Sequence, residues 1–282
     1  MGQILGMLEN YDLAKMGPNS PEAWRLIGDA SRLAFADRGR YMADSDFVSV
    51  PVKGLLNKKY LNKRATLLNQ KKALKTVSPG NPSFDTTRTL ADDESIELPS
   101  TSHISIVDQY GNALSMTTTI ENAFGSRLMT EGGFLLNNEM TDFSFRAIKD
   151  GVPIANRIEP GKRPRSSMAP TIVLKNEKPY LVIGSPGGSR IIGFVAKTII
   201  AYADWGMTIQ QAVSLPHLIN RFGTFELETN TKAEIMEVPL SLAGFKVKLR
   251  GLNSGLHAIA IYEDRLEGGA DPRREGLAYG NR

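Results

Sequence analysis

The sequence contains no cysteine and only three histidines. Without cysteine the chain has no disulfide, no thiolate metal site and no cysteine nucleophile. His103, His217 and His257 lie far apart in the sequence, and none falls in a metal-binding spacing such as HExxH, which argues against a zinc hydrolase. We therefore expect no metal and no cofactor, and a packing role for the histidines.

Several other functional motifs are missing. There is no GxSxG sequence, which weakens an interpretation as an α/β-hydrolase. The Gly-rich segment 184–189 matches neither GxGxxG nor GxxxxGK[ST], so a nucleotide-binding fold is not supported. A basic run from Lys53 to Lys75 has no aromatic or Gly-rich module beside it, which indicates a solvated helical face and no nucleic-acid partner. No apolar run approaches the roughly 20 residues that span a bilayer.

The N-terminal part of the chain reads as mostly helical. The whole chain has 282 residues, which is long enough to bury a full core; it is 41% hydrophobic and carries a net charge of +4. Ser20 followed by Pro21 predicts a helix start, because serine caps helices and proline suits the first helical position. A second helical region follows and is expected to break near Gly54 and Tyr60.

The C-terminal part is mostly β-like. Ile104 and Ile106 alternate with Ser105 and Val107, and a turn at residues 110–112 leads to ALSMTTTI, which predicts a hairpin. Further elements are expected as strands at Gly133–Leu136, at TIVL and YLVIG on either side of Asn176 and within residues 243–264, and as a helix after Gly188. This order of helices and strands predicts an α+β layered sandwich.

A segment of different composition joins the two parts. Residues 76–100 are rich in Pro, Ser, Thr and Asp and show no periodicity. Such a segment predicts an exposed, flexible connector. Connectors of this kind are the usual places where a chain is cut.

Thr101 stands where this connector meets the predicted hairpin. If the bond between Ser100 and Thr101 were cut, Thr101 would gain an α-amine with a pKa of about 7.7–8.0, which can serve as the base for its own hydroxyl. An amidase could then work without histidine, cysteine or metal. The pattern alone favours the plainer interpretation, in which Thr101 is simply the first residue of a strand.

Several motifs resemble the gamma-glutamyltranspeptidase (glutathione hydrolase) family, and they occur in the family's order. The start of the small subunit is matched by TSHISIVDQYGNALSMTTTIENAFGS, followed by GGFLLNNEMTDFSF, GKRPRSSMAPTIV, GSPGGSRII and the tail GGADPRREGLAYG. Upstream, SRLAFADRGRYMADSDF and VPVKGLL resemble the end of the large subunit. Nearly the whole chain is covered by the resemblance.

The resemblance implies a fold, a processing step and a reaction. The family has an αββα sandwich of the N-terminal-nucleophile type, which would be incomplete here because most of the large subunit is absent. Residues 1–100 would be the C-terminal part of the large subunit and residues 101–282 the small subunit. Self-cleavage at Ser100–Thr101 would make Thr101 the nucleophile that cleaves γ-glutamyl amides such as glutathione, passing the acyl group to water, an amino acid or a peptide.

The same resemblance implies roles for further residues. Thr119 would hydrogen-bond the nucleophile, and Gly187 and Gly188 would form the oxyanion hole, a role that backbone N–H groups at a helix start can fill. The remaining positions would bind the substrate: the acids Glu139 and Asp142 its α-amine, the serines Ser166 and Ser167 its α-carboxylate, and Glu121 would help to set donor recognition.

Two features depart from the family pattern. Glu121 stands where many members have Asn, and a carboxylate there would favour an amine and disfavour a nearby substrate carboxylate, so a strict preference for glutathione is not implied. Glutaryl-type (cephalosporin) amide acylases share the scaffold, and such an acylase is an alternative function. The missing large-subunit portion predicts a partner chain, because loss of one layer exposes apolar surface. A second alternative is an unprocessed fragment that acts only as an assembly subunit. The compartment would be periplasmic or secreted if a full-length precursor carries a signal peptide.

Overall fold

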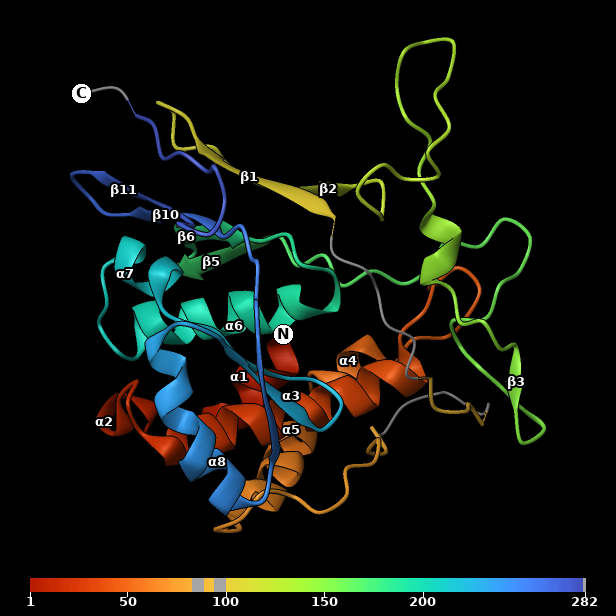
Figure 1. Cartoon of the computed structure of the whole chain (residues 1–282), viewed down its shortest axis with the longest axis horizontal. Helices are drawn as coiled ribbons and strands as arrows, with labels where there is room; N and C mark the ends of the chain where they lie inside the picture. The colour runs from red at the N-terminus through yellow and green to blue at the C-terminus, as the bar shows by residue number, and fades with distance from the viewer. Residues whose placement is uncertain (83–88, 94–99, 281–282) are drawn as a thin grey trace. The chain divides into compact units, whose positions relative to one another are not determined.

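The computed structural model describes residues 1–82, 89–93 and 100–280 and has the predicted α+β composition (Figure 1). The described residues form two compact units whose segments interleave along the chain. Unit 1 contains residues 1–96, 139–166 and 218–250, and unit 2 contains residues 97–138, 167–217 and 251–282. The units therefore do not follow the expected cleavage point at residue 100, because segments on both sides of that point share unit 1.

The helices of unit 1 pack around α3 (Pro21–Tyr41). The predicted start of this helix is confirmed, since the Ser20 hydroxyl accepts from the Ala23 N–H at 3.2 Å and Pro21 is the first helical residue. The other elements of this unit are α1 (Gly2–Leu8), α2 (Leu13–Met16), α4 (Val52–Leu55), α5 (Lys58–Ala65), η1 (Thr66–Asn69), η2 (Glu139–Asp142), β3 (Ile148–Lys149), β4 (Val152–Pro153), β7 (Leu218–Asn220), β8 (Thr224–Glu228), η4 (Lys232–Met236), α8 (Glu237–Ala243) and β9 (Lys246–Arg250). Among the described residues no helix is both long and apolar enough to cross a membrane.

Helix α3 also holds two parts of the segment that the sequence predicts to be a connector. Near the start of that segment, the Gly80 N–H donates to Asp37 Oδ1 at 2.7 Å, and the Tyr41 hydroxyl donates to the Gly80 carbonyl at 2.7 Å. Further along, Arg40 Nε donates to Asp92 Oδ1 at 2.6 Å. These residues belong to successive turns of α3, so one helix end fixes the chain at both places.

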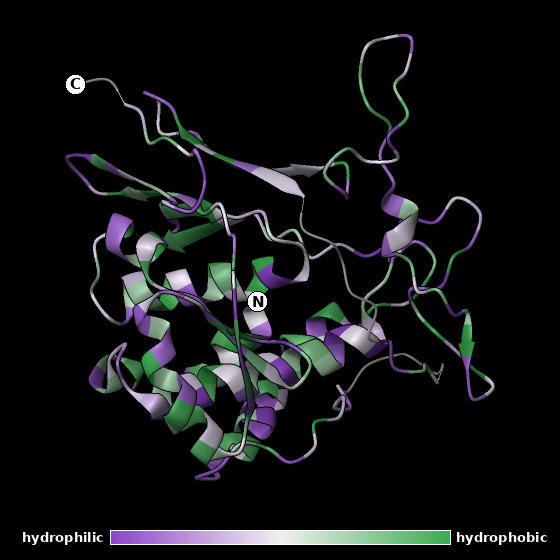
Figure 2. Cartoon of the chain, in the orientation of Figure 1, coloured by the Kyte–Doolittle hydropathy of each residue, from purple (hydrophilic) through white to green (hydrophobic). Residues whose placement is uncertain are grey.

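Unit 2 is layered. Its central sheet has the strand order β11-β10-β6-β5, with antiparallel neighbours, and the β1–β2 hairpin packs on one face while α6 and α7 cover the other (Figure 1). The elements are β1 (Thr101–Val107), β2 (Ala113–Thr119), β5 (Thr171–Lys175), β6 (Lys178–Gly184), η3 (Gly188–Arg190), α6 (Ile191–Ala203), α7 (Ile209–Ser214), β10 (His257–Ile261) and β11 (Leu266–Ala270). Hydrophobic colouring in stripes on α6 marks its core-forming residues (Figure 2).

The β1–β2 hairpin has an inverted polarity for a strand pair on a protein surface. Its inward positions are largely polar, whereas its outward positions are mostly apolar and at least 40% exposed: Ile104, Ile106, Leu114 and Met116. A solvated sheet face normally alternates the other way, with polar side chains outward. The outer face of the hairpin therefore has the composition of a buried layer.

Two sequence-based expectations need correction. Residues 133–136 do not form a strand; a single bridge joins Met129 to Leu135 in an irregular hairpin. The helical region after Lys53 breaks between α4 and α5, close to Gly54 as expected, but Tyr60 lies inside α5 because Asn57 caps that helix. The β5–β6 turn is confirmed at Asn176, whose φ of 52° is left-handed, as tight hairpin turns require.

Candidate active site

The β1–β2 hairpin brings the predicted nucleophile opposite the predicted helper threonine. Thr101 and Thr119 are paired across the two strands. The Thr119 hydroxyl donates to the carbonyl oxygen of Ser100 at 2.7 Å and accepts from the Glu121 N–H at 2.9 Å. The Thr119 hydroxyl is thus aimed at the carbonyl of the Ser100–Thr101 bond, where it polarises the carbon next to the Thr101 nitrogen.

The His103 side chain packs between this hairpin and the backbone of Gly184. Its Nε2 donates to Ser105 Oγ at 3.1 Å, because the Ser105 proton is directed to the His257 carbonyl. Its Nδ1 accepts from the Thr117 hydroxyl at 2.8 Å. The ring lies against the backbone of Gly184, where an added Cβ would be 2.1 Å from it. Both nitrogens are therefore engaged within this packing contact, which agrees with a supporting role and not with that of a base.

Burial lowers the pKa of His103 from 6.5 to about 4, with a smaller contribution from the charge of nearby His257. The unfolded chain takes up this proton near pH 6.5, whereas the folded chain does so only near pH 4, so the free energy of unfolding falls as the pH drops through this window. The contribution of His103 to this loss is about 3 kcal/mol. We expect urea denaturation between pH 7 and pH 4 to show a shallower loss of stability in His103→Gln than in the wild type. Equal slopes would contradict a buried neutral His103.

The predicted oxyanion-hole glycines lie in a tight turn between β6 and α6. Gly187 has a φ of 137° and Gly188 a φ of 57°, a backbone region that favours glycine. A Cβ on Gly187 would lie 2.6 Å from the Phe194 ring. The turn opens the helical run that continues into α6, so its N–H groups belong to a helix start, where negative charge is stabilised. Both interpretations of these glycines, turn and oxyanion hole, are compatible with this geometry.

Glu121 follows the hairpin in a strained backbone conformation. It is buried and has a φ of 72°, which is uncommon for a residue with a side chain. Its carboxylate accepts a hydrogen bond from the side chain of Asn138, whose Oδ1 accepts from the Asn122 N–H at 3.0 Å. Strained residues that the surroundings hold in place cluster at functional sites. Asn138 was not singled out from the sequence, because nothing local marks it as the partner of Glu121.

A second group of predicted residues lies in unit 1. Glu139 and Asp142 are the first and last residues of the η2 turn, and Asp142 is buried. The carbonyl of Asp142 accepts from Asn156 Nδ2 at 2.8 Å, and Oδ1 of the same amide accepts from the Arg165 N–H at 2.9 Å. Arg165 immediately precedes Ser166. The structure thus connects the predicted amine-binding turn with one of the predicted serines through a residue that the sequence did not indicate.

The predicted site residues are divided between the two units. Unit 2 holds Ser100, Thr101, Thr119, Glu121, Ser167, Gly187 and Gly188. Unit 1 holds Glu139, Asp142 and Ser166. The nucleophile and oxyanion-hole positions therefore lie on one compact body, and both predicted amine-binding acids lie on the other.

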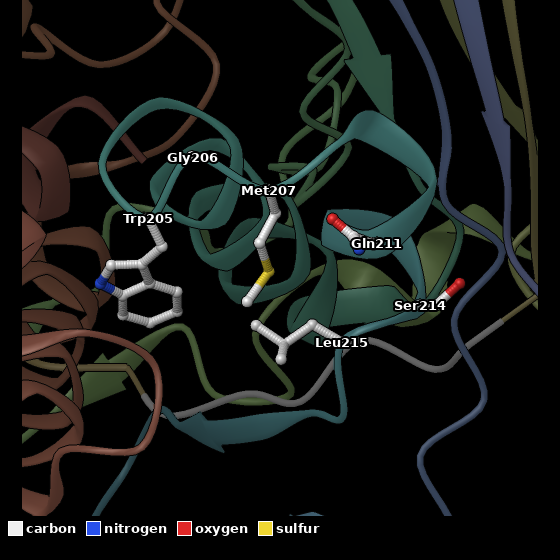
Figure 3. Close-up of a pocket in the computed structure, with 6 residues that line it drawn as sticks. All are labelled: Trp205, Gly206, Met207, Gln211, Ser214 and Leu215. Carbon is white, nitrogen blue, oxygen red and sulfur yellow. The ribbon is translucent and has the colours of Figure 1, made fainter.

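A surface pocket elsewhere in unit 2 contains none of these residues. Its volume is about 500 Å³, and it is lined by Trp205, Gly206, Met207, Gln211, Ser214 and Leu215 (Figure 3). The lining offers no charged group. Within the described ranges no cluster of three or more His, Cys, Asp or Glu side chains could hold a metal ion.

Comparison with solved structures defines the class of protein. A cephalosporin acylase from Bacillus halodurans matches the whole chain with a TM-score of 0.81 at 21% identity, covering 49% of that protein. A gamma-glutamyltranspeptidase from Pseudomonas nitroreducens, complexed with L-DON, matches 64% of this chain and 99% of its own chain, with a TM-score of 0.57 at 35% identity. The fold is that of the N-terminal-nucleophile hydrolases.

The family follows from the sequence comparisons. The family described as "Gamma-glutamyltranspeptidase" matches residues 1–281. The "Glutathione hydrolase proenzyme" of Bacillus subtilis (strain 168) is 35% identical over 289 residues, which cover 99% of this chain and 48% of that protein. The chain belongs to the gamma-glutamyltranspeptidase family. It spans about half the length of the curated relatives it matches.

Proposed function

We propose that the chain carries the nucleophile of a glutathione hydrolase and γ-glutamyltransferase, and that Thr101 is released by self-cleavage after Ser100. The observation that carries this proposal is the 2.7 Å hydrogen bond from the Thr119 hydroxyl to the Ser100 carbonyl. Hydrogen-bond donors aimed at a carbonyl stabilise the negative charge that develops on its oxygen during attack. In processing, Thr101 Oγ attacks the Ser100 carbonyl carbon, the C–N bond breaks, and water then hydrolyses the resulting ester.

The proposed catalytic cycle uses the new α-amine of Thr101. The amine accepts the proton of Thr101 Oγ, which attacks the γ-carbonyl carbon of the donor, while the Gly187 and Gly188 N–H groups stabilise the oxyanion. The amine then returns the proton to the leaving nitrogen, and an acyl ester remains on Thr101. Water or the amine of an amino acid or peptide attacks this ester and regenerates the hydroxyl.

Relative lengths support the proposed division of the chain. The Pseudomonas chain aligns with 64% of the 282 residues, which is about 180, over nearly all of its own length. The segment that follows Ser100 has 282 − 100 = 182 residues. A separate chain of this length in a relative is what cleavage at residue 100 would produce. The word "proenzyme" in the name of the Bacillus relative points in the same direction.

We also propose that a partner polypeptide covers the outer face of the β1–β2 hairpin. This chain matches about half of its relatives' length, so the other half of those proteins has no counterpart in it. The apolar outer face, with Ile104 and Ile106 on β1, supports this assignment. Exposed apolar side chains gathered on one face mark interaction surfaces.

A donor panel tests the proposed substrate against the acylase alternative. γ-Glutamyl-p-nitroanilide has an α-amine, whereas glutaryl-p-nitroanilide lacks it. Because charge-assisted hydrogen bonds from the α-ammonium group to the acids contribute about 1.5–3 kcal/mol, we expect kcat/KM to be roughly 10- to 100-fold higher for the γ-glutamyl donor. The assay would use the chain alone and the chain produced with the N-terminal half of a family member. A preference for the glutaryl donor would favour the acylase alternative.

A further inference from the structure

A fully buried asparagine crosses the interior of the segment 139–166 in unit 1. Asn156 makes three hydrogen bonds to backbone groups of this segment. Its Nδ2 donates to the Asp142 carbonyl at 2.8 Å, its Oδ1 accepts from the Arg165 N–H at 2.9 Å, and its own carbonyl accepts from the Ser144 N–H at 2.9 Å. The amide therefore uses a donor on one side and an acceptor on the other, a combination that no carboxylate or hydrocarbon side chain reproduces.

The segment at residues 163–165, which Asn156 contacts, is fixed from two further directions. Arg163 donates to Asp44 through its backbone N–H and Nε, both at 2.9 Å, and through Nη2 at 2.8 Å. Hydrogen bonds from Arg163 hold the pKa of Asp44 well below its usual range, so the pair stays ionised. Arg165 Nη2 lies 3.0 Å from Asp93 Oδ2. These contacts leave the backbone at residues 163–165 little freedom, and Ser166 follows directly.

The loop that carries Asn156 is itself held in place. The buried ammonium of Lys162 donates to the Ala155 carbonyl at 2.7 Å and to Glu159 Oε1 at 2.8 Å. Asn156 is thus anchored through its neighbour, and its amide links the backbone at Asp142 to the backbone at Arg165. Buried hydrogen bonds of this kind stabilise a defined geometry because breaking them leaves unsatisfied polar groups.

We propose that Asn156 is a positioning residue that sets the spacing between the amine-binding turn at Glu139–Asp142 and the carboxylate-binding position at Ser166. This inference rests on the proposed function, which assigns these residues to the donor. The α-amine and α-carboxylate of a γ-glutamyl group leave the same carbon, so the protein groups that bind them must keep one fixed separation. The Asn156 amide bonds to the last residue of the turn and to the residue directly before Ser166.

The test compares Asn156→Asp with the wild type in a preparation that shows Thr101-dependent turnover. Asp keeps the size and the acceptor for Arg165 but cannot donate to the Asp142 carbonyl. We measure competitive inhibition constants for L-glutamate, glutarate, which lacks the amine, and 4-aminobutyrate, which lacks the α-carboxylate. We expect the constant for L-glutamate to rise about tenfold, while each analogue, which uses one anchoring point, changes less than about threefold. The kcat should stay within about twofold.

A second variant and a matched control separate positioning from general destabilisation. In an Asp142→Asn background, Asn156→Asp should have little additional effect, because coupled residues are not additive. Asn220→Asp changes another buried asparagine of unit 1, whose Oδ1 accepts from the Gly223 N–H, and should leave all three inhibition constants unchanged. Equal losses for all three ligands, or unchanged L-glutamate inhibition in Asn156→Asp, would overturn the inference.

Hydrogen exchange on the chain as it stands provides a readout that does not depend on turnover. Asn156→Asp should increase amide exchange at residues 139–147 and 157–166, with no change in α3 or α6. Unchanged exchange in those two segments would also overturn the inference. By contrast, a complete absence of Thr101-dependent turnover in every preparation would sink the proposed function, so the two failures are distinguishable.

Discussion

Thr101→Ala is expected to remain a single chain of 282 residues under conditions in which the wild type splits into pieces of 100 and 182 residues. Alanine has no hydroxyl to attack the Ser100 carbonyl, although the Thr119 hydroxyl would still polarise it. Turnover of γ-glutamyl-p-nitroanilide should fall by at least about 10³-fold, because the acyl-enzyme cannot form. Intact mass after incubation at neutral pH, with and without an N-terminal partner half, is the measurement.

Two variants control this result. Thr101→Ser keeps a hydroxyl at the same place and should still be cleaved. Thr118→Ala changes an outward-facing threonine of the same hairpin and should be cleaved at the wild-type rate. If Thr101→Ala were cleaved at the same bond as the wild type, the nucleophile would have to be another residue. If the wild type stayed whole with the partner present, the proposed processing would be wrong.

The elements that sequence predicts well are those with local signals. The Ser20–Pro21 start of α3, the β1–β2 hairpin and the β5–β6 turn at Asn176 each depend on residues within a few positions of one another. The predicted strand at residues 133–136 was wrong because it relied on a local signal alone. Its short apolar run resembles a buried strand, but Gly133 adopts a φ of 80° and the side chains of Phe134 and Leu136 are exposed.

Interactions between distant residues were not predictable. The residues around Gly80 and Asp92 have the composition of an exposed connector, yet α3 binds them through pairs more than 35 residues apart in the sequence. The interleaving of the two compact units has the same origin. Periodicity describes which face of an element is buried, but not which distant segment covers it.

The candidate site shows the same limit. The order of the family motifs indicated Thr101, Thr119 and the glycine pair, and the pairing of Thr101 with Thr119 follows from hairpin register. The asparagines that hold neighbouring site residues, Asn138 and Asn156, carry no local sign of their role. An asparagine in a loop usually marks a turn, and only burial distinguishes a linking amide from a solvated one.

The second large effect is expected for Asp37→Ala in α3. Asp37 is fully buried and accepts four hydrogen bonds: Gln3 Nε2 at 2.7 Å, the Tyr60 hydroxyl at 2.7 Å, Arg64 Nη2 at 3.3 Å and the Gly80 N–H at 2.7 Å. Alanine would leave these donors, including a buried guanidinium, without their acceptor. Removing one partner of a buried ion pair costs about 3–5 kcal/mol, so the free energy of unfolding should fall by this amount.

Urea denaturation followed by circular dichroism measures the loss, with Asp264→Ala as the control. Asp264 pairs with Arg265 at the surface, where an ion pair contributes about 0–1 kcal/mol, so this variant should unfold almost as the wild type does. A second readout reports on the site itself. Burial raises the pKa of Tyr60, and its hydrogen bond to Asp37 raises it further. In Asp37→Ala the Tyr60 phenol should therefore ionise at lower pH in an ultraviolet titration. Equal stability of the two variants would show that Arg64 and Gly80 find other acceptors, and that Asp37 does not hold this end of α3 together.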